Sequence, residues 1–513
     1  MPPSSECTAR LLKAQWHDIV IFNMTSEPIK SIVICGAGLA PWLTAAALSN
    51  QLPSSIDITV LDTSNSDRAD VFYGSITNPA TYNFHSMIGL TEADLLMRTR
   101  SSFSYGTHYK NWGLTGATWT QCFHGPFPIW NGVPLTHHMI GATQNFESYL
   151  VSTQAAIAGK FAHPPSDQSV ALSSAEYGYH IHAADLTVLM KIIASKNGVQ
   201  TVSRDIVSIE HSEGKIETLN LTPGESLSAD LFIDASGPQA QLISSFEDDS
   251  FQTQRRLAAL YSEQQNSRIG APVRQLNSEG FGWQSITPLQ GIDAVLTVFD
   301  PKSEEEARKS HSAKDPLHVE LSIGERRDAW RGNCVAIGQA AAVTEPISPA
   351  PIMLLQMDIQ RLLGLIPVAK DFSVETRIFN DAFQLDLENI RLFNSAFHQI
   401  ENILEAPYWT AAKMSSSSTK LTRKLTQFSN RGLLVNYDLE PFNAEDWTIL
   451  HYGIGRQPKK KDLFAELSDT SEIRQKLEHM ANAIQTIVNK MPPHHIYLAN
   501  YLNYLERNHV SEL

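Results

Sequence analysis

Residues 30–52 read KSIVICGAGLAPWLTAAALSNQL, and this stretch decides the fold. An apolar strand runs into a glycine turn, and a helix rich in Ala and Leu follows. A second strand, IDITVLD (56–62), then ends in the acid Asp62. This order is the context that a dinucleotide fingerprint requires. We expect Gly36 to make the tight turn, Gly38 to let the backbone approach a pyrophosphate, and Asp62 to hold a ribose hydroxyl.

Pro41 occupies the third glycine position of the fingerprint. Proline is tolerated in the first turn of a helix, so the helix is still expected to form. A lone Gly-x-Gly also occurs in other strand–turn–helix units, and the flanking strands are what favour a nucleotide here.

Two later segments extend the pattern. ADLFIDASG (229–237) is a strand that runs into a small-residue turn, and DAWRGNCVAIGQAAAVTEP (328–346) is another buried strand that ends at Gly338. FAD enzymes of the glutathione-reductase type use this order, with a first βαβ unit for the ADP moiety and a late strand–helix beside the flavin. We therefore expect an α/β fold: an FAD-binding, Rossmann-like domain with an additional β-sheet and a mostly helical C-terminal substrate region.

The composition narrows the classes of function. The chain has 513 residues, of which 42% are hydrophobic and 18% charged, and its formal charge is −14. With no long basic run, a nucleic-acid partner is not expected. No apolar stretch reaches the roughly 18 residues of a membrane span. The four cysteines are far apart, which argues against zinc and disulfides and favours a cytoplasmic protein; they are Cys7, Cys35, Cys122 and Cys334.

We divide the chain into three parts. Residues 1–23 are interpreted as an N-terminal extension, because Met24 stands close to the first strand. Residues 24–365 are expected to form the FAD-binding domain, with an inserted β-rich substrate segment at about 85–190. Residues 366–513 are expected to be a helical region on the substrate side, because apolar residues recur there at helical spacing.

Seven fragments, in order along the chain, resemble the flavin-dependent tryptophan halogenases. They are IVICGAGLAPWLTAAAL (32–48), GSITNP (74–79), IGLTEADLLMRTRSSFSYGTHYKNW (88–112), YHIHAADL (179–186), DLFIDASG (230–237), GNCVAIGQAAAVTEP (332–346) and NKMPPHHIYLANYL (489–502). GWQSITPL (282–289) takes the place of the family's Trp-x-Trp-x-Ile-Pro motif and retains Trp283 and Pro288.

The resemblance implies a chemistry and its partners. A separate flavin reductase supplies reduced FAD, whose reaction with oxygen oxidises a halide to hypohalous acid. A lysine then presents the halogen to a small aromatic substrate, and a glutamate assists. The cofactor contacts that the resemblance implies are Gly36, Gly38, Leu39, Ala40, Asp62, the strap Ser75, Ile76 and Thr77, and Gly338 and Ile352. A homodimer is left open.

The sequence departs from the family where the halogen is handled. The lysine position falls on Ser104, the glutamate position on Ser348, and the two halide-binding positions on Ala350 and Pro351. Proline has no N–H to donate, so the halide site is at best half present. We therefore do not expect halogenating activity to carry over.

Neighbouring residues do not replace the lysine in this reading. If 102–110 is one strand, Ser104, His108 and Lys110 share a face, with His108 roughly 13 Å and Lys110 roughly 20 Å from Ser104.

His137 and His138 would point apart on a strand, so no metal site is expected. His180 and His182 are expected to be structural, at the start of a helix. Trp447 and His451 are the residues expected to line a substrate pocket.

Three functions remain open. The first is a divergent flavoenzyme that oxidises or otherwise modifies an aromatic substrate. The second is a non-catalytic FAD-binding protein that has kept the fold. The third is a halogenase with an atypical site, in which Ser104 and Ser348 hydrogen-bond the hypohalous acid.

Overall fold

The computed structural model describes residues 28–64, 67–113, 116–140, 145–249, 251–400, 406–435, 440–461 and 463–508. The proposed extension, residues 1–23, and Cys7 lie outside these ranges. The first sheet has six strands in the order β19-β20-β13-β1-β2-β9. Their bounds are Trp330–Arg331, Cys334–Ala336, Leu231–Asp234, Ser31–Cys35, Asp57–Asp62 and Gln200–Ser203. All neighbours in it run parallel except β19 and β20.

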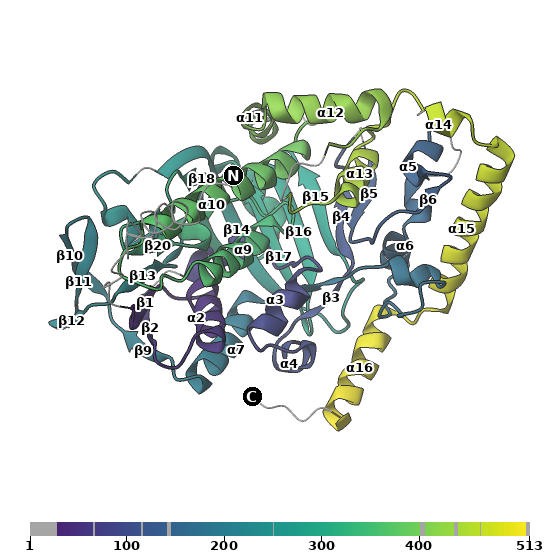
Figure 1. Cartoon of the computed structure of the whole chain (residues 1–513). Coiled ribbons are helices and arrows are strands. Elements are labelled where there is room, and N and C mark those ends of the chain that lie inside the picture. Colours follow the sequence, from purple (N-terminus) through teal and green to yellow (C-terminus); the bar gives the residue numbers. More distant parts are fainter. Residues whose placement is uncertain are drawn as a thin grey trace, which may run out of the picture.

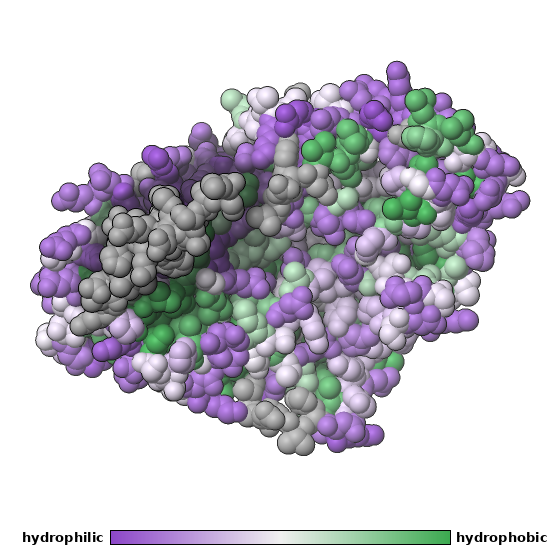
Figure 2. All heavy atoms as spheres, in the orientation of Figure 1, coloured by the Kyte–Doolittle hydropathy of each residue, from purple (hydrophilic) through white to green (hydrophobic). Residues whose placement is uncertain are grey.

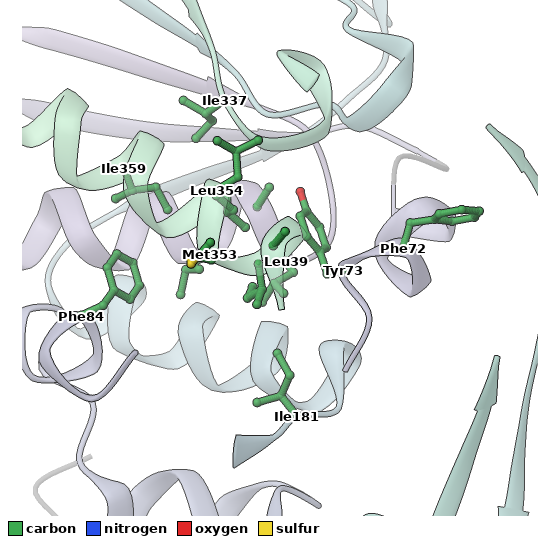
Figure 3. Close-up of a cluster of buried hydrophobic side chains, with 14 of the residues drawn as sticks. Leu39, Phe72, Tyr73, Phe84, Ile181, Ile337, Met353, Leu354 and Ile359 are labelled. Carbon is green, nitrogen blue, oxygen red and sulfur yellow. The ribbon is translucent and has the colours of Figure 1, made fainter. Parts of the chain in front are cut away.

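Three helices pack around this sheet. They are α2 (Leu39–Gln51), α7 (Ala183–Lys196) and α9 (Ala350–Gly364). Because α2 is almost entirely buried, its apolar residues lie on all of its faces and it is not amphipathic. Figure 3 shows Leu39 of α2 beside Met353 and Leu354 of α9, in the largest buried cluster of the described chain. The predicted Rossmann-like domain is thus confirmed.

The additional sheet is larger than the first. Its eight strands follow the order β21-β18-β14-β17-β16-β15-β4-β5. Their bounds are Ala342–Val343, Leu317–Arg326, Phe251–Gln265, Ile292–Phe299, Gly282–Pro288, Arg274–Glu279, Gly106–Lys110 and Thr118–Cys122. The strands are antiparallel except that β15 and β4 run parallel. Figure 1 shows this sheet in the middle of the molecule, with α9 and α10 on one side.

The segment proposed as the β-rich insert holds short strands and short helices. The strands are β3 (Ser102–Ser104), β6 (Ile129–Trp130), β7 (Val133–Pro134) and β8 (Gly178–His180), besides β4 and β5. The helices and turns are α4 (Glu92–Arg98), α5 (Leu135–His138), η2 (Phe146–Tyr149), α6 (Val151–Ile157) and η3 (Ala171–Ser174), after η1 (Asp67–Tyr73) and α3 (Thr81–Met87).

Two local predictions in this segment were wrong. Residues 102–110 are not one strand, because β3 pairs with β8 while β4 joins the large sheet. The chain changes sheets at Tyr105, and Gly106 follows with φ of 135°. A Cβ on Gly106 would lie 2.1 Å from the carbonyl oxygen of Gln121, so only glycine fits there. His137 and His138 lie in the short helix α5 instead of a strand.

A further small sheet and several short helical elements connect the strands of the two large sheets. The three-stranded sheet consists of β10 (Ile206–Ser212), β11 (Lys215–Leu221) and β12 (Glu225–Leu227). The other short elements are η4 (Gly237–Gln239), η5 (Ile243–Ser245), η6 (Pro301–Ser303), α8 (Glu304–His311) and η7 (Gly338–Ala340).

The C-terminal part is helical, as predicted. Its helices are α10 (Ser373–Ala396), α11 (Pro407–Ser415), α12 (Thr419–Arg431), α13 (Ala444–Gly453), α14 (Leu463–Glu466), α15 (Thr470–Lys490) and α16 (His494–Asn508). Figure 1 shows α15 and α16 along one edge of the molecule. Figure 2 shows mainly hydrophilic side chains over that edge. Among the described residues, no helix combines the length and apolar character needed to cross a membrane. The division into domains stays a prediction.

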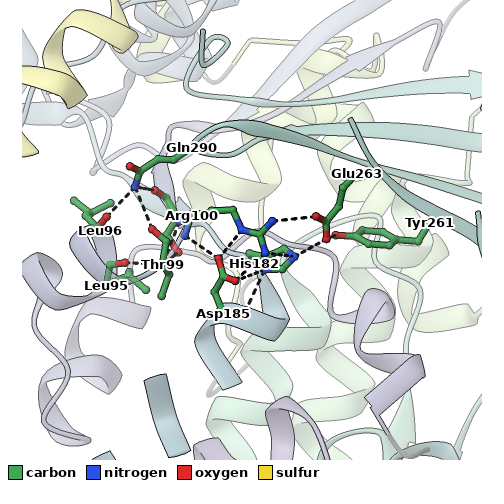
Figure 4. A network of polar contacts seen from close by, with 10 residues as sticks. Leu95, Leu96, Thr99, Arg100, His182, Asp185, Tyr261, Glu263 and Gln290 are labelled. Atoms are coloured by element: carbon green, nitrogen blue, oxygen red, sulfur yellow. Dashed lines mark hydrogen bonds and ion pairs between the residues drawn. The ribbon is translucent and has the colours of Figure 1, made fainter. Parts of the chain in front are cut away.

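A polar network ties the start of α7 to the large sheet (Figure 4). Arg100 contacts Asp185 at 2.8 Å and Glu263 at 3.0 Å. His182 caps α7 by accepting the N–H of Asp185 at its Nδ1, and its Nε2 contacts Glu263 at 2.8 Å. The structural role expected for His182 is confirmed. The network positions β8 and the turn that follows it.

Candidate functional site

The glycine turn after β1 has the geometry predicted for it. Gly36 has φ of 137°, and a Cβ there would lie 2.5 Å from the carbonyl oxygen of Ala235. Its N–H donates to Leu61 of β2 at 3.0 Å. Gly38 has φ of 86° and is the N-cap residue of α2, where it has no side chain of its own to accept an N–H of the first turn. Both positions therefore require glycine, and the N-terminus of α2 carries the positive end of its dipole.

The acid predicted for the ribose lies at the end of β2. Asp62 is its last residue, and the ammonium of Lys191 lies 3.6 Å from its carboxylate. The same ammonium lies over the ring of Trp42, 4.8 Å from its centre. Asp62 and the start of α2 thus share one edge of the sheet, as a nucleotide site requires.

The predicted strap lies across the end of β8. Ser75 has a positive φ of 53°, and its carbonyl accepts the N–H of Ile181 at 3.1 Å. Ile76 pairs with His180, and the N–H of Thr77 donates to Tyr179 at 2.9 Å. These backbone bonds hold residues 75–77 as an extra edge beside β8.

The entrance to α9 is closed by its own residues. Pro349 occupies the N-cap position without a capping hydrogen bond, and Pro351 lies in the first turn. The Oγ of Ser348 donates to Asn394 of α10 at 2.7 Å and accepts the N–H of Ala350 at 3.2 Å. At the two positions predicted for a halide, one N–H is therefore already bonded and the other does not exist. Ile352 follows, buried in the same turn.

A buried arginine holds this entrance in place. Arg274 of β15 is fully buried, and its guanidinium donates to the carbonyls of Pro346 at 2.8 Å and Ile347 at 2.7 Å. It also donates to the carbonyl of Gly74, just before the strap, at 3.2 Å. Tyr109 donates to Ile347 at 2.5 Å. Burial lowers the pKa of Arg274, because no carboxylate among its hydrogen-bond partners compensates its charge.

Glu345 anchors the other side of the entrance. Its buried carboxylate pairs with Arg255 and accepts hydrogen bonds from Tyr408 and from Trp283 Nε1, the latter at 2.7 Å. Burial alone would raise the pKa of Glu345. The charge of Arg255 and the hydrogen bond from His398 outweigh burial and hold the pKa well below the usual range. The carboxylate is saturated by these partners.

Ser104 is buried where β3 ends. Its hydroxyl accepts the N–H of Gly106 at 3.2 Å and contacts the carbonyl of the same residue at 3.3 Å. The hydroxyl is thus used in the turn that passes the chain from one sheet to the other.

The two predicted substrate residues lie in α13. Trp447 is 1% exposed, and its Nε1 donates to Glu440 at 3.1 Å. His451 is fully buried, with its ring stacked on Phe428 at 3.9 Å between centres. Burial holds the pKa of His451 well below its ordinary value. The centres of the Trp447 and His451 rings lie 6.0 Å apart, and a substrate-facing role for the two residues stays a prediction.

In the ranges that the structure describes, no group of three or more His, Cys, Asp or Glu side chains could hold a metal ion.

A model of the tryptophan halogenase family matches residues 31–470. The chain belongs to the tryptophan halogenase family. Tryptophan 6-halogenase ThaL of Streptomyces albogriseolus is 25% identical over 448 residues, covering 80% of this chain and 83% of the relative. 7-Chloro-L-tryptophan 6-halogenase KtzR of Kutzneria sp. is 24% identical, covering 91% of this chain and 99% of the relative.

A solved member of the same fold is the flavin-dependent halogenase BrvH from Brevundimonas sp. BAL3. It superposes with a TM-score of 0.85 at 24% identity, covering 92% of this chain and 99% of that protein. At this identity the likeness shows the tryptophan halogenase fold and not the activity.

Three residues that the sequence analysis missed organise this member of the family. Arg274 and Glu345 hold the entrance to α9, and Asp70 of η1 accepts the N–H of Leu39 at the start of α2. Glu345 follows the apolar strand Ala342–Val343, where a charged residue is unusual, and that pattern was the available signal. Arg274 begins the polar strand β15, with the sequence RQLNSE, which gives no such signal. Asp70 carried none, because its partner is a backbone group in another element.

Proposed function

We propose that this chain is an FAD-dependent enzyme of the tryptophan halogenase family that oxidises or modifies a small aromatic substrate without halogenating it. The residues present fit FAD at one edge of the six-stranded sheet. Gly36 and Gly38 form the turn before α2, and their φ values of 137° and 86° are conformations that favour glycine. Asp62 lies at the end of the neighbouring strand, at the same edge.

These residues would divide the cofactor between them. The start of α2 (Gly38, Leu39, Ala40) would hold the pyrophosphate, and Asp62 the ribose. The strap Ser75, Ile76 and Thr77, with Gly338 and Ile352, would border the flavin. When bound in its reduced form, FAD supplies the electrons for activating oxygen. The chain's own residues would orient the substrate and exclude water.

One observation carries the non-halogenating part of the proposal. The N–H of Ala350 is bonded to Ser348 at 3.2 Å, and Pro351 has no N–H. A halide at these positions would have no open donor from either residue, and desolvating an anion without donors is costly. Ser104, at the lysine position, brings no charge. At positions 350 and 351 there is therefore no open N–H for a halide, and at position 104 there is no charged group to present the halogen.

The substrate side is proposed to be the helical region after residue 366, near Trp447 and His451. We also propose that a separate flavin reductase supplies the reduced cofactor, because the sequence carries a single dinucleotide fingerprint. The cysteines support a cytoplasmic protein without disulfides: Cys35, Cys122 and Cys334 are free and buried.

The first test follows reoxidation of reduced FAD on the protein. We expect the rate measured by stopped-flow absorbance after mixing with oxygen to be the same with and without chloride or bromide, because no donor pair holds the halide. Sodium nitrate at equal ionic strength is the control. A saturable effect of halide at millimolar concentration, absent with nitrate, would contradict the proposal.

A further inference from the structure

A carboxylate lies at the start of α2. The N–H of Leu39 donates to Oδ2 of Asp70 at 2.8 Å. Asp70 belongs to η1, more than thirty residues further along the chain, and is partly buried. A carboxylate at a helix N-terminus is stabilised by the backbone N–H groups and by the helix dipole, as a phosphate would be.

Few other donors remain in the first turn of α2. Pro41 has no N–H, and that of Leu39 is already bonded. Of the first three helical residues, Ala40 is therefore the one whose N–H is still available to a ligand. A pyrophosphate arriving at this turn therefore competes directly with Asp70 for the N–H of Leu39.

η1 also contacts η7, which begins at Gly338, a residue predicted to border the cofactor. The carbonyl of Ala69 accepts a hydrogen bond from the side chain of Gln339, in η7, at 3.0 Å. The hydroxyl of Tyr73 lies 2.7 Å from the place where a Cβ on Gly338 would be. Figure 3 shows Tyr73 pointing among the apolar side chains, close to Leu39 and Leu354. One short turn thus reaches both the start of α2 and the start of η7.

We propose that the carboxylate of Asp70, in η1, takes the place of a cofactor phosphate at the N–H of Leu39 and competes with that phosphate for it. The inference rests on the proposed FAD site and adds a residue that sets its affinity. A dinucleotide phosphate that takes the N–H of Leu39 must displace the carboxylate of Asp70 from it. Asp70 therefore weakens binding of any ligand that carries a pyrophosphate.

The test compares the wild-type protein with Asp70→Asn, using FAD and ADP as probes and riboflavin as the probe without phosphate. Dissociation constants are measured by fluorescence for the flavins and by calorimetry for ADP. A hydrogen bond to a charged group is strong, so we expect Asp70→Asn to bind FAD and ADP about tenfold more tightly. Riboflavin binding should not change. Asp70→Ser, which also removes the charge, should act in the same direction.

Asp57→Asn is the matched control. It makes the same change of charge on the same sheet, but Asp57 is exposed at the start of β2, at the opposite end of the strand from Asp62. We expect its affinities to equal those of the wild type, and melting temperatures check that every variant folds.

Two results would overturn the inference, and they are distinguishable. If the wild type binds FAD and ADP and the Asp70 variants bind them equally or more weakly, Asp70 does not compete with the phosphate and the proposed FAD site still stands. If neither the wild type nor any variant binds FAD or ADP, the proposed FAD site fails together with the inference.

Discussion

Replacing Glu345 with glutamine is expected to lower the free energy of unfolding by about 3–5 kcal/mol, because it leaves the buried charge of Arg255 without its counter-ion. The carboxylate also accepts hydrogen bonds from Trp283 and Tyr408, and an amide can satisfy only part of that set. Urea denaturation followed by fluorescence measures the change. The lost contacts are those between Glu345 and its partners beside the entrance to α9, so local disorder should appear there before global unfolding.

Glu304→Gln is the control for this prediction. Glu304 pairs with Arg308 at 2.8 Å on the exposed face of α8, where an ion pair contributes about 0–1 kcal/mol. The pH dependence gives a second check. Because the pKa of Glu345 is depressed in the fold, its contribution is present above roughly pH 4.3 and is lost as the pH falls further. An effect of Glu345→Gln as small as that of Glu304→Gln would refute the role assigned to the carboxylate.

The second large effect concerns cofactor binding. Gly38→Asp is expected to weaken FAD binding at least about a hundredfold, because it places a carboxylate against the pyrophosphate and a side chain at φ of 86° and ψ of −156°. Titration of FAD with detection by fluorescence quenching measures the loss.

Gly198→Asp is matched to it. Gly198 has φ of 88°, and nothing lies within 4 Å of the place where its Cβ would be. The variant therefore carries the same charge and a similar backbone strain away from the proposed site. Comparable FAD affinities for Gly38→Asp and the wild type would remove the glycine turn from the cofactor site.

The nucleotide fold was predictable because its signals are local. Gly36 and Gly38 stand between an apolar strand and an apolar helix, and such a unit folds in the same way in many proteins. The strand at 229–237 and the turn at Gly338 could be added because strand and glycine turn adjoin in the sequence. The helices after residue 366 follow the 3.6-residue period.

The details of the candidate site depend on contacts between distant residues. Residues 102–110 alternate like one strand, but the close approach of Gln121 to Gly106 belongs to the large sheet and is invisible in the local pattern. In the same way, Asp70 meets Leu39, and Arg274 meets Pro346, only after the chain has folded. Hydrogen bonds of this kind follow no sequence period.

Ser348, Ala350 and Pro351 were identified by their positions relative to the family's glutamate and halide-binding residues. The structure shows why these three residues occur together. Ser348 bonds both Asn394 and the N–H of Ala350, so the serine and the prolines form one closed turn. Glutamate at position 348 would have no place for its charge in that turn without other changes. The assignment of Ser104, Ser348, Ala350 and Pro351 as positions of lost function stays a prediction.

The central claim is that this member of the tryptophan halogenase family does not halogenate, and mass spectrometry of the reaction mixture tests it most directly. The protein is supplied with free tryptophan, reduced FAD, oxygen and either chloride or bromide. The combined variant Ser104→Lys, Ser348→Glu, Ala350→Thr and Pro351→Gly is run alongside, because residues that act as a unit are strongly non-additive. The account predicts no chlorinated or brominated tryptophan from the unmodified protein above the protein-free background. Halotryptophan formed by the unmodified protein in amounts that rise with its concentration would contradict the account.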